Sequence, residues 1–391
     1  MSSARTASIL VLNAGSSSLK FALLEAGKEE ALVSGQIGGI GQTPYLLLDG
    51  LCLDSPIPAD VRHGEAFELI FDWLVRQGHE PSRLSAFGHR MVHGGNIYSS
   101  PVIVDDTVER NLAKLQRLAP LHMPAGIGVL KRARRLVPEV PQIACFDTAF
   151  HTTQPDEATR LPLPGAYFDR GYRRYGFHGL NYEHVVSVLP RLSGTLPRRL
   201  IIAHLGQGAS MCAVKDGRSV ATTMGYSTAD GLVMGTRTGA IDPGVLVSLL
   251  RDDRLTVDEL DDLIYRGSGL LGLSGISGDM RTLLESEAPE ARRAVDHYCY
   301  WAARHAGSLA VALQGLDALV FTGGIGENAP LVRSRILDHL AWLGVSCDVE
   351  RNRQNAPSLS AAGVACPVFI VKANEEVAIA RHVLALVRQP A

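Results

Sequence analysis

The fold is indicated by a stretch near the N-terminus, ILVLNAGSSSLKFALLEAGK at residues 9–28. A second stretch, IIAHLGQGASMCAVKDGR at residues 201–218, repeats its pattern when Gly15 is aligned with Gly206, an offset of 191 residues. Both have an apolar strand, a polar residue, a turn of glycine and small or polar residues, and a second apolar strand. This pattern is typical of a β-hairpin whose tip is tightened by glycine. An offset of about half the chain predicts a duplicated domain.

Three short apolar runs have the length and residue types of strands, at residues 9–12, 200–203 and 318–321. Each leads into a Gly-rich polar turn, at residues 13–18, 204–208 and 322–328. Helical patterns lie at residues 65–77, 290–313 and 331–343, and the long middle one has Pro289 at its start, where proline is tolerated. Strands alternating with helices predict an α/β protein.

Composition excludes several classes of function. The 391 residues are 46% hydrophobic and 20% charged with a net charge of -2, so neither bulk disorder nor a nucleic-acid partner is expected. The one dense basic run is KRARR at residues 131–135. The apolar run at residues 9–12 is too short for a secretory signal or a membrane span, and the six cysteines form no C-x-x-C pair. We therefore expect a reduced, cytoplasmic, soluble protein with no membrane partner.

Gly-rich turns at strand ends supply backbone N–H groups to a phosphate, and three such turns favour nucleotide binding. None of them is a P-loop or a Rossmann fingerprint. Fixed positive charge is available from Arg90, in GHRMVHGG at residues 88–95, and from Arg237, in MGTRTG at residues 234–239. An arginine among glycines does not lie on the solvated face of a helix, and the neighbouring glycines let a ligand approach closely. The alternative for each is a structural arginine that pairs with a carboxylate.

Histidines and one aspartate complete the candidate site. His122, His151 and His178 lie in turn-like contexts beside proline or aromatic residues, which suits a partly buried polar site. The sequence contains no H-E-x-x-H pattern, which would place two histidine metal ligands on one helix. Asp147 follows the apolar stretch at residues 143–146, and a carboxylate at a strand end is a common catalytic placement in α/β folds. A helix-capping aspartate is the alternative.

Nine motifs occur in order between Asn13 and Glu376: NAGSSSLKF, GHRMVHGG, PLHMP, FDTAFH, YGFHG, HLGQGAS, MGTRTGAIDPG, FTGGIGENA and NEE. Together they resemble the acetokinase family of acetate and propionate kinases, in the acetate and sugar kinase/Hsp70/actin superfamily. The resemblance implies reversible phosphoryl transfer from ATP to acetate or another short-chain carboxylate, giving an acyl phosphate and ADP. It also implies Mg²⁺, or Mn²⁺ in its place, and a homodimer.

The resemblance implies an α/β fold of two duplicated βββαβαβα domains, of the ribonuclease H-like or actin-like ATPase type, with the active site in the cleft between them. We expect an N-terminal lobe of residues 1–150 plus 375–391 and a C-terminal nucleotide-binding lobe of residues 151–374. The matched positions imply catalytic roles for Asp147, His178 and Arg237, and acyl-substrate binding by Arg90, Val92, Leu121, His122 and Phe177. They imply nucleotide contacts from Lys20, His204, Leu205, Gly206, Gln207, Gly208, Asp279, Met280, Arg281, Gly324, Ile325, Gly326, Glu327 and Asn328, and metal binding by Asn13 and Glu375, with Glu376 as the nearest competitor.

The chemistry of the implied reaction predicts the mechanism. A carboxylate is already a nucleophile at neutral pH, so the obstacle is the repulsion between two anions, and catalysis is charge neutralisation and alignment. We expect Arg90 to hold the carboxylate, Arg237 to hold the equatorial phosphoryl oxygens, and His178 to donate a hydrogen bond to the same group. Asp147 is expected to orient an arginine or the hydrated Mg²⁺.

Several positions depart from the family pattern. Gln207 replaces an asparagine, Ala240 an aspartate and Thr228 a proline of the acyl pocket, while HGTSH has become HGLNY at residues 178–182. Because one methylene in such a pocket is worth about 1–3 kcal/mol, acetate and propionate stay open alternatives. Nucleotide preference and the direction of flux stay open as well. A propionate or butyrate kinase is one alternative, and a non-catalytic nucleotide-binding protein of the actin/Hsp70 type is another.

Overall fold

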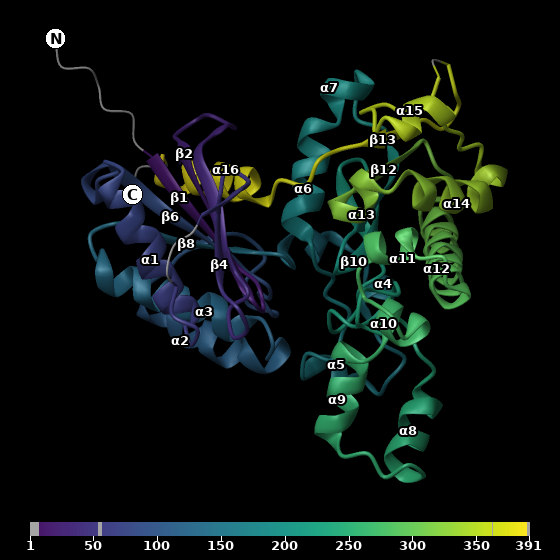
Figure 1. Ribbon diagram of the computed structural model, residues 1–391, viewed down its shortest axis with the longest axis horizontal. Coiled ribbons are helices and arrows are strands. Elements are labelled where there is room, and N and C mark those ends of the chain that lie inside the picture. Colours follow the sequence, from purple (N-terminus) through teal and green to yellow (C-terminus); the bar gives the residue numbers. More distant parts are fainter. Residues whose placement is uncertain (1–7, 54–56, 362, 389–391) are drawn as a thin grey trace. The chain divides into compact units, whose positions relative to one another are not determined.

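The computed structural model describes residues 8–53, 57–361 and 363–388. These residues form two compact units (Figure 1), one made of the chain up to Ala149 together with the chain from Asn374 onward, the other of Phe150–Ala373. The outermost parts of the expected lobes, residues 1–7 and 389–391, lie outside the described residues. The last described helix therefore belongs to the same unit as the first strands.

The first unit is built on an eight-stranded sheet with the order β5-β4-β3-β2-β1-β6-β8-β7. Its strands are β1 (Ser8–Ala14), β2 (Ser18–Glu25), β3 (Ala31–Gly38), β4 (Tyr45–Leu48), β5 (Leu51–Leu53), β6 (Leu84–Met91), β7 (Val102–Ile103) and β8 (Gln142–Phe146). Strands β1 to β5 form an antiparallel meander, and β6 and β8 continue the sheet in parallel with β1. The unit's α-helices are α1 (His63–Arg76), α2 (Asp106–Leu115), α3 (Met123–Leu136) and α16 (Glu375–Val387), with 3₁₀ turns at Pro81–Arg83 and Gln116–Leu118.

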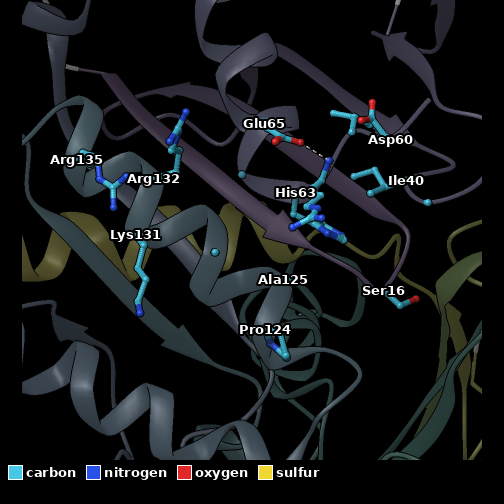
Figure 2. Close-up of a pocket in the computed structure, with 15 residues that line it drawn as sticks. Ser16, Ile40, Asp60, His63, Glu65, Pro124, Ala125, Lys131, Arg132 and Arg135 are labelled. Atoms are coloured by element: carbon cyan, nitrogen blue, oxygen red, sulfur yellow. Dashed lines mark hydrogen bonds between the residues drawn. The ribbon is translucent and has the colours of Figure 1, made fainter. Parts of the chain in front are cut away.

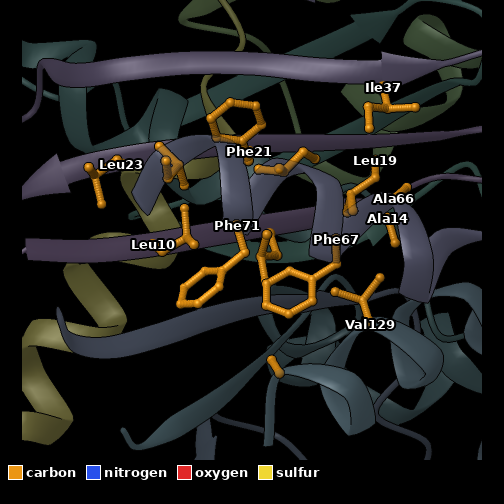
Figure 3. Close-up of a cluster of buried hydrophobic side chains, with 14 of the residues drawn as sticks. Leu10, Ala14, Leu19, Phe21, Leu23, Ile37, Ala66, Phe67, Phe71 and Val129 are labelled. Carbon is orange, nitrogen blue, oxygen red and sulfur yellow. The ribbon is translucent and has the colours of Figure 1, made fainter. Parts of the chain in front are cut away.

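Alternation of side chains along β1 divides this sheet into two packed faces. Leu10, Leu12 and Ala14 enter a buried cluster with Phe67 and Phe71 of α1 and Val129 of α3 (Figure 3). The opposite face is covered by α16, and the contact is closest at Gly88 of β6. A Cβ at Gly88 would lie only 2.5 Å from Cγ2 of Ile379, so the glycine lets the C-terminal helix sit directly on the strand.

The second unit has a five-stranded sheet with the order β11-β10-β9-β12-β13. Its strands are β9 (Arg199–Leu205), β10 (Ala209–Lys215), β11 (Arg218–Thr222), β12 (Ala318–Thr322) and β13 (Val368–Ile370). Its α-helices are α4 (Asp156–Thr159), α5 (Gly165–Asp169), α6 (Gly179–Val188), α7 (Pro190–Ser193), α8 (Pro243–Arg251), α9 (Val257–Arg266), α10 (Gly269–Ser274), α11 (Met280–Glu285), α12 (Pro289–Leu313), α13 (Gly323–Asn328), α14 (Pro330–Leu340) and α15 (Val349–Arg353). Short 3₁₀ turns lie at Ala149–Thr153, where the two units join, and at Ala341–Leu343.

The two sheets confirm the duplication predicted from the repeat. In both, an antiparallel three-strand meander is followed by two strands parallel to its first strand. Strand β9 begins and ends 191 residues after β1, and β10 begins 191 residues after β2. The sheet of the second unit packs α6 against one face, through Tyr182 and Val185, while α12 packs against β9, β10 and β11. Figure 1 shows α6 and α12 on opposite sides of β10.

Most expected elements are confirmed, and one is corrected. The helices expected at residues 65–77 and 290–313 are α1 and α12, and α12 starts at Pro289. The third Gly-rich segment, expected as a turn, is the short helix α13. Gly323 has φ 79°, which only glycine adopts without strain, and this turn redirects the chain from β12 into helix. Among the described residues, no helix combines the length and apolar character that a membrane crossing requires.

Candidate functional site

A polar cluster forms where β1, β6, β8 and α16 meet in the first unit. Side-chain alternation places Asn13 with Val11 on the α16 face of β1, and Arg90 with Gly88 on the same face of β6. Asp147 immediately follows β8, and Glu375 is the first residue of α16. The fold thus brings together four predicted site residues that lie as much as 362 positions apart in sequence.

Arg90 is the centre of this first-unit cluster. Its Nη2 lies 2.5 Å from Asp147 Oδ2 and its Nε 3.1 Å from Asp147 Oδ1, which is a bidentate ion pair. Nε also lies 3.3 Å from Glu375 Oε2, and Nη1 donates to Asn13 Oδ1 at 3.2 Å. Burial opposes its charge, but Asp147 and Glu375 raise the pKa of Arg90, so the guanidinium stays charged. The sequence alternative, an arginine paired with a carboxylate, is therefore present in the structure.

Asp147 is only 1% exposed and meets Arg90 through both oxygens. Its backbone N–H donates to the carbonyl of Met91, which ties it to the end of β6. Asp147 thus contacts Arg90 at the point where β6 and β8 end.

Asn13 joins the acidic start of α16 to the same cluster. Its Nδ2 donates to Glu375 Oε2 at 2.9 Å and to Glu376 Oε1 at 3.4 Å. Asn374 caps the helix by accepting from the backbone N–H of Val377. Carboxylates at a helix N-terminus are stabilised by the helix dipole.

The donor set of this cluster has the chemistry of a magnesium site. Among residues 8–53, 57–361 and 363–388 no group of three or more His, Cys, Asp and Glu side chains is placed to hold a metal. Asn13, Glu375 and Glu376 nevertheless offer an amide and two carboxylates. Mg²⁺ is commonly held by one or two carboxylates together with waters and substrate phosphates, so the residues fit that ion.

The remaining predicted residues of the first unit flank the cluster. Lys20 is the cross-strand partner of Asn13 in the β1–β2 ladder, which places both side chains on one face. Val92 is buried directly after β6. Leu121 and His122 lie at the start of α3, where His122 occupies the N-cap position. Phe177, expected in the same acyl pocket, is buried in the second unit.

Donor groups of the second unit surround the turn between β9 and β10. A Cβ placed on Gly208 would lie 3.5 Å from both Arg237 Nη1 and His178 Nε2. A Cβ on Gly206 would lie 3.9 Å from His204 Nε2 and 3.8 Å from the backbone nitrogen of Gly324. The glycines leave open the space that these groups face. Guanidinium, imidazole and backbone nitrogens around a bare backbone turn form an arrangement suited to phosphate oxygens.

Two further predicted segments meet the same turn at Gln207. The backbone N–H of Gly235 donates to the Gln207 carbonyl at 3.3 Å, and a Cβ on Gly235 would clash with Gln207 Oε1 and with the Gly278 carbonyl. Arg237 donates through Nη1 to the Thr228 carbonyl at 3.1 Å. The structure thus brings residues 234–239 beside Gln207 and Gly278. Gly278 immediately precedes the predicted nucleotide residues Asp279, Met280 and Arg281 in the sequence.

Two acidic residues predicted to contact nucleotide have structural bonds. Asp279 is the N-cap of α11 and accepts from the backbone N–H of Thr282 at 3.0 Å. Glu327 Oε1 accepts from the backbone N–H groups of Gly323 and Ala373, and so joins both ends of the segment between β12 and α16. Asn328 donates back to the Gly324 carbonyl. Ile325 and Gly326 complete the same helix, α13.

His178 has a left-handed backbone at the start of α6, with φ 59° and ψ 21°. Such a conformation is uncommon outside glycine and costs energy, and it is found at functional positions. Its ring stacks on His204, with centroids 4.2 Å apart. Nδ1 of His178 lies 2.8 Å from Ser210 Oγ, which leaves Nε2 directed at Gly208.

His151, for which the sequence predicted no specific role, supports the segment before His178. Its Nε2 lies 2.9 Å from the Phe177 carbonyl and its Nδ1 2.9 Å from Ser219 Oγ. Burial lowers the pKa of His151 to about 4, although the bond to Phe177 opposes this change. The ring is therefore neutral at pH 7. Because a carbonyl only accepts, Nε2 carries the proton and Ser219 donates to Nδ1.

Three residues of the second-unit site were missed in the sequence: Asn181, Tyr182 and Ser210. Asn181 Nδ2 lies 2.9 Å from His204 Nδ1, and Tyr182 Oη lies 2.5 Å from Ser210 Oγ. The signal that would have found Ser210 is strand alternation. Leu200 and Ile202 of β9, and Cys212 and Val214 of β10, pack on the α6 face, so His204 and Ser210 must point to that helix as well.

A cavity of about 780 Å³ lies elsewhere in the first unit, between the start of α1 and the middle of α3 (Figure 2). It includes Lys131 and Arg132 of the KRARR run and Ser16 of the β1–β2 turn. Arg132 pairs with Glu68, and Lys131 lies 3.7 Å from Glu109. His63 on its wall bonds the Gly15 carbonyl at 2.8 Å, which fixes the turn that follows Asn13.

Known proteins of one family share the sequence and the fold of this chain. Residues 8–381 match the model of the acetokinase family. The acetate kinase of Rhodopseudomonas palustris is 47% identical over 387 residues, covering 96% of this chain and 97% of that protein. The crystal structure of a propionate kinase from Francisella tularensis has a TM-score of 0.91 at 34% identity, covering 96% of this chain and 98% of that one. The crystal structure of Porphyromonas gingivalis acetate kinase has a TM-score of 0.88 at 33% identity, covering 98% and 100%.

Proposed function

Because this chain belongs to the acetokinase family, with its two-domain actin-like ATPase fold, we propose that it is an ATP:acetate phosphotransferase. One carboxylate oxygen of acetate forms a bond to the γ-phosphorus of ATP. The bond from that phosphorus to the β–γ bridging oxygen breaks, and ADP leaves with the electron pair. The observation that carries the proposal is the pair of polar clusters, one around Arg90 and one around Gly208.

The first-unit cluster is assigned to the acyl acceptor. Arg90 binds the acetate carboxylate, and Asp147 acts through Arg90 by accepting from Nε and Nη2 on one edge of its guanidinium. No general base is required, because the nucleophile is already ionised at neutral pH. Val92, Leu121, His122 and Phe177 are assigned to the surroundings of the acyl group.

The second-unit cluster is assigned to the transferring phosphoryl group. Arg237 neutralises the equatorial oxygens, and His178 donates a hydrogen bond to them from Nε2. Preorganised donors of this kind are worth about 10²–10³ in rate each, because they need no reorganisation when charge shifts. The backbone nitrogens of residues 204–208 and 324–328 are assigned to the nucleotide phosphates, and Lys20 is a further residue assigned to the nucleotide.

Asn13 and Glu375 are assigned to Mg²⁺, or Mn²⁺ in its place. A bound divalent ion neutralises charge on the β- and γ-phosphates and orients them. Glu375 is preferred to Glu376 because it lies closer to Asn13 and also reaches Arg90.

A propionate kinase is the second candidate, because the chain is similar along nearly its whole length to a propionate kinase structure. The test of both is a hydroxamate assay with purified protein, Mg-ATP and acetate, propionate or butyrate. Acyl hydroxamate formed fastest with acetate supports the proposal. Fastest product with propionate favours the second candidate. ATP turnover that is equal with and without any carboxylate would contradict both and favour the actin/Hsp70-type alternative.

A homodimer and a cytoplasmic location complete the proposal. Within the described part of the chain no residue of α8 or α9 is buried, and Val245, Val247 and Val257 are 46%, 53% and 75% exposed. An apolar surface of this kind is typical of an interface between subunits. Light scattering during size-exclusion chromatography gives the mass directly, and a single protomer would contradict the dimer. The free thiols of the described cysteines suit a reducing compartment.

A further inference from the structure

A short chain of side chains joins helix α6 to the ring of His178. Tyr182 Oη lies 2.5 Å from Ser210 Oγ, and the same Ser210 Oγ lies 2.8 Å from His178 Nδ1. Ser210 and Tyr182 are both 0% exposed, so bulk water does not compete for these bonds. The ring of Tyr182 is fixed by edge-on packing against His151, with centroids 5.6 Å apart.

The serine hydroxyl has one hydrogen, and its direction decides the tautomer of His178. If Ser210 donates to His178, Nδ1 accepts and the ring proton lies on Nε2. If Ser210 donates to Tyr182, Nδ1 must carry the proton and Nε2 is a bare lone pair. A phenol is more acidic than an aliphatic alcohol and is the stronger donor. The favoured direction is therefore from Tyr182 to Ser210 to His178.

The second imidazole of the stacked pair is set in the same way. Asn181 Nδ2 lies 2.9 Å from His204 Nδ1 and also donates to Thr322 Oγ1 at 3.3 Å. An amide N–H only donates, so His204 Nδ1 accepts and its proton lies on Nε2. Asn181 and Tyr182 are neighbours in the first turn of α6, which thus controls the Nδ1 side of both rings.

We propose that Tyr182 and Ser210 are positioning residues that hold His178 in its Nε2–H tautomer, with that N–H directed at the transferring phosphoryl group. The proposal rests on the function proposed above. Nε2 faces the space over Gly208, which Arg237 Nη1 also faces. A lone pair there would repel phosphoryl oxygens, whereas an N–H stabilises them.

The test uses the full-length protein with ¹⁵N-labelled histidine and long-range ¹H–¹⁵N spectra of the rings. The His178→Gln variant identifies the signals of His178. We expect wild-type His178 to be protonated on Nε2, and we expect Tyr182→Phe to move it toward the Nδ1–H tautomer. In the hydroxamate assay the same variant should lose about threefold to tenfold in kcat, the effect of one neutral hydrogen bond, with the acetate KM unchanged.

Tyr175→Phe is the matched control. Tyr175 is a buried tyrosine of the same segment, and its hydroxyl donates to the Gly171 carbonyl at 2.8 Å, away from the chain to His178. This variant removes an equivalent phenol bond and should leave both the tautomer and kcat unchanged.

Wild-type His178 protonated on Nδ1 overturns the proposal, and so does a folded Tyr182→Phe protein with the wild-type tautomer. If Tyr182→Phe does not fold, Ser210→Ala tests the same chain, and the wild-type spectrum stands alone as a test. The spectrum requires no turnover. A protein with the expected tautomer that makes no acyl phosphate therefore contradicts the proposed function, whereas an active enzyme with the other tautomer contradicts only this inference.

Discussion

The β1–β2 hairpin of the first unit and the β9–β10 hairpin of the second are built alike, yet their polar positions carry different chemistry. Asn13 and His204 occupy equivalent places, 191 residues apart, and each points to the sheet face covered by a helix start. Against Asn13 the helix is α16, which begins with two glutamates. Against His204 it is α6, which offers an amide and a phenol. The duplicated sheet fixes the position of the polar side chain in each unit. The helix packed against it decides which charged or polar groups surround that side chain.

Charge therefore divides between the two units. The first-unit cluster combines one arginine with three carboxylates, those of Asp147, Glu375 and Glu376, which suits a divalent cation beside a single anionic group. The second-unit cluster combines Arg237, two imidazoles and backbone nitrogens, which suits phosphate. Two substitutions test this division directly, and a third substitution and a pH experiment test the packing within each unit.

The largest effect is expected from Arg237→Ala. Losing the guanidinium beside Gly208 should lower kcat by about 10²–10³, because the charge developing on the phosphoryl group is no longer neutralised. The hydroxamate assay measures it. Arg293→Ala, at an exposed arginine of α12 that pairs with Glu290, is the control and should keep wild-type turnover. Near-normal turnover in Arg237→Ala would contradict the assignment of the second-unit cluster to the transferring phosphoryl group.

Glu375→Gln should raise the Mg²⁺ concentration needed for half-maximal activity by about tenfold to a hundredfold, since an interaction with a full charge is worth about 1.5–3 kcal/mol. Titration of activity with Mg²⁺ measures this. Glu376→Gln is the matched control, with a smaller expected change because Glu376 lies farther from Asn13. A larger change in Glu376→Gln than in Glu375→Gln would identify Glu376 as the metal ligand.

Gly88→Ala tests the contact that seats α16 on the first sheet. The new methyl group would lie 2.5 Å from Ile379 Cγ2 and 3.0 Å from Val383 Cγ2, and overpacking of this kind costs about 1–3 kcal/mol of unfolding free energy. Gly128→Ala in α3 is the control, because no described atom outside its own helix backbone and its chain neighbours lies within 4 Å of its Cβ, and it should stabilise by at most about 1 kcal/mol. Urea unfolding measures both, and equal midpoints would show that α16 does not need the glycine.

The smallest expected effect is the unfolding free energy that each of three buried histidines loses in acid. Burial lowers the pKa of His89 and His93 in the first unit, and of His151 in the second, from 6.5 to about 4. A neutral buried histidine stabilises the fold fully above pH 6.5, and that contribution is lost as the pH falls toward 4. Each should cost about 1 kcal/mol between pH 6.5 and 5.5. Urea midpoints at both pH values measure the loss, and His151→Gln should reduce it. A midpoint independent of pH would contradict the burial of all three.

Local patterns in the sequence predicted much of the fold. The repeat predicted both hairpins, and the apolar runs predicted β1, β9 and β12. The helix α13 escaped prediction because its glycines favour turns, and only the chain direction after Gly323 selects helix. Of the candidate site, Arg90 and Asp147 stood out as a charge among glycines and a carboxylate at a strand end. Asn181 and Tyr182 did not, because their partners lie on other elements and are known only once α6 is packed.

The return of α16 to the first unit has a consequence for synthesis. The nascent chain makes β1, β6 and β8 early, but the helix that covers one face of their sheet is translated only after the whole second unit, tens of seconds later at about 5–20 residues per second. Until then Asn13 and Arg90 lack Glu375, and the sheet face around Gly88 lacks Ile379 and Val383 of α16. A chain that stops before residue 375 therefore lacks both the helix that covers this face of the sheet and the carboxylate that contacts Asn13 and Arg90.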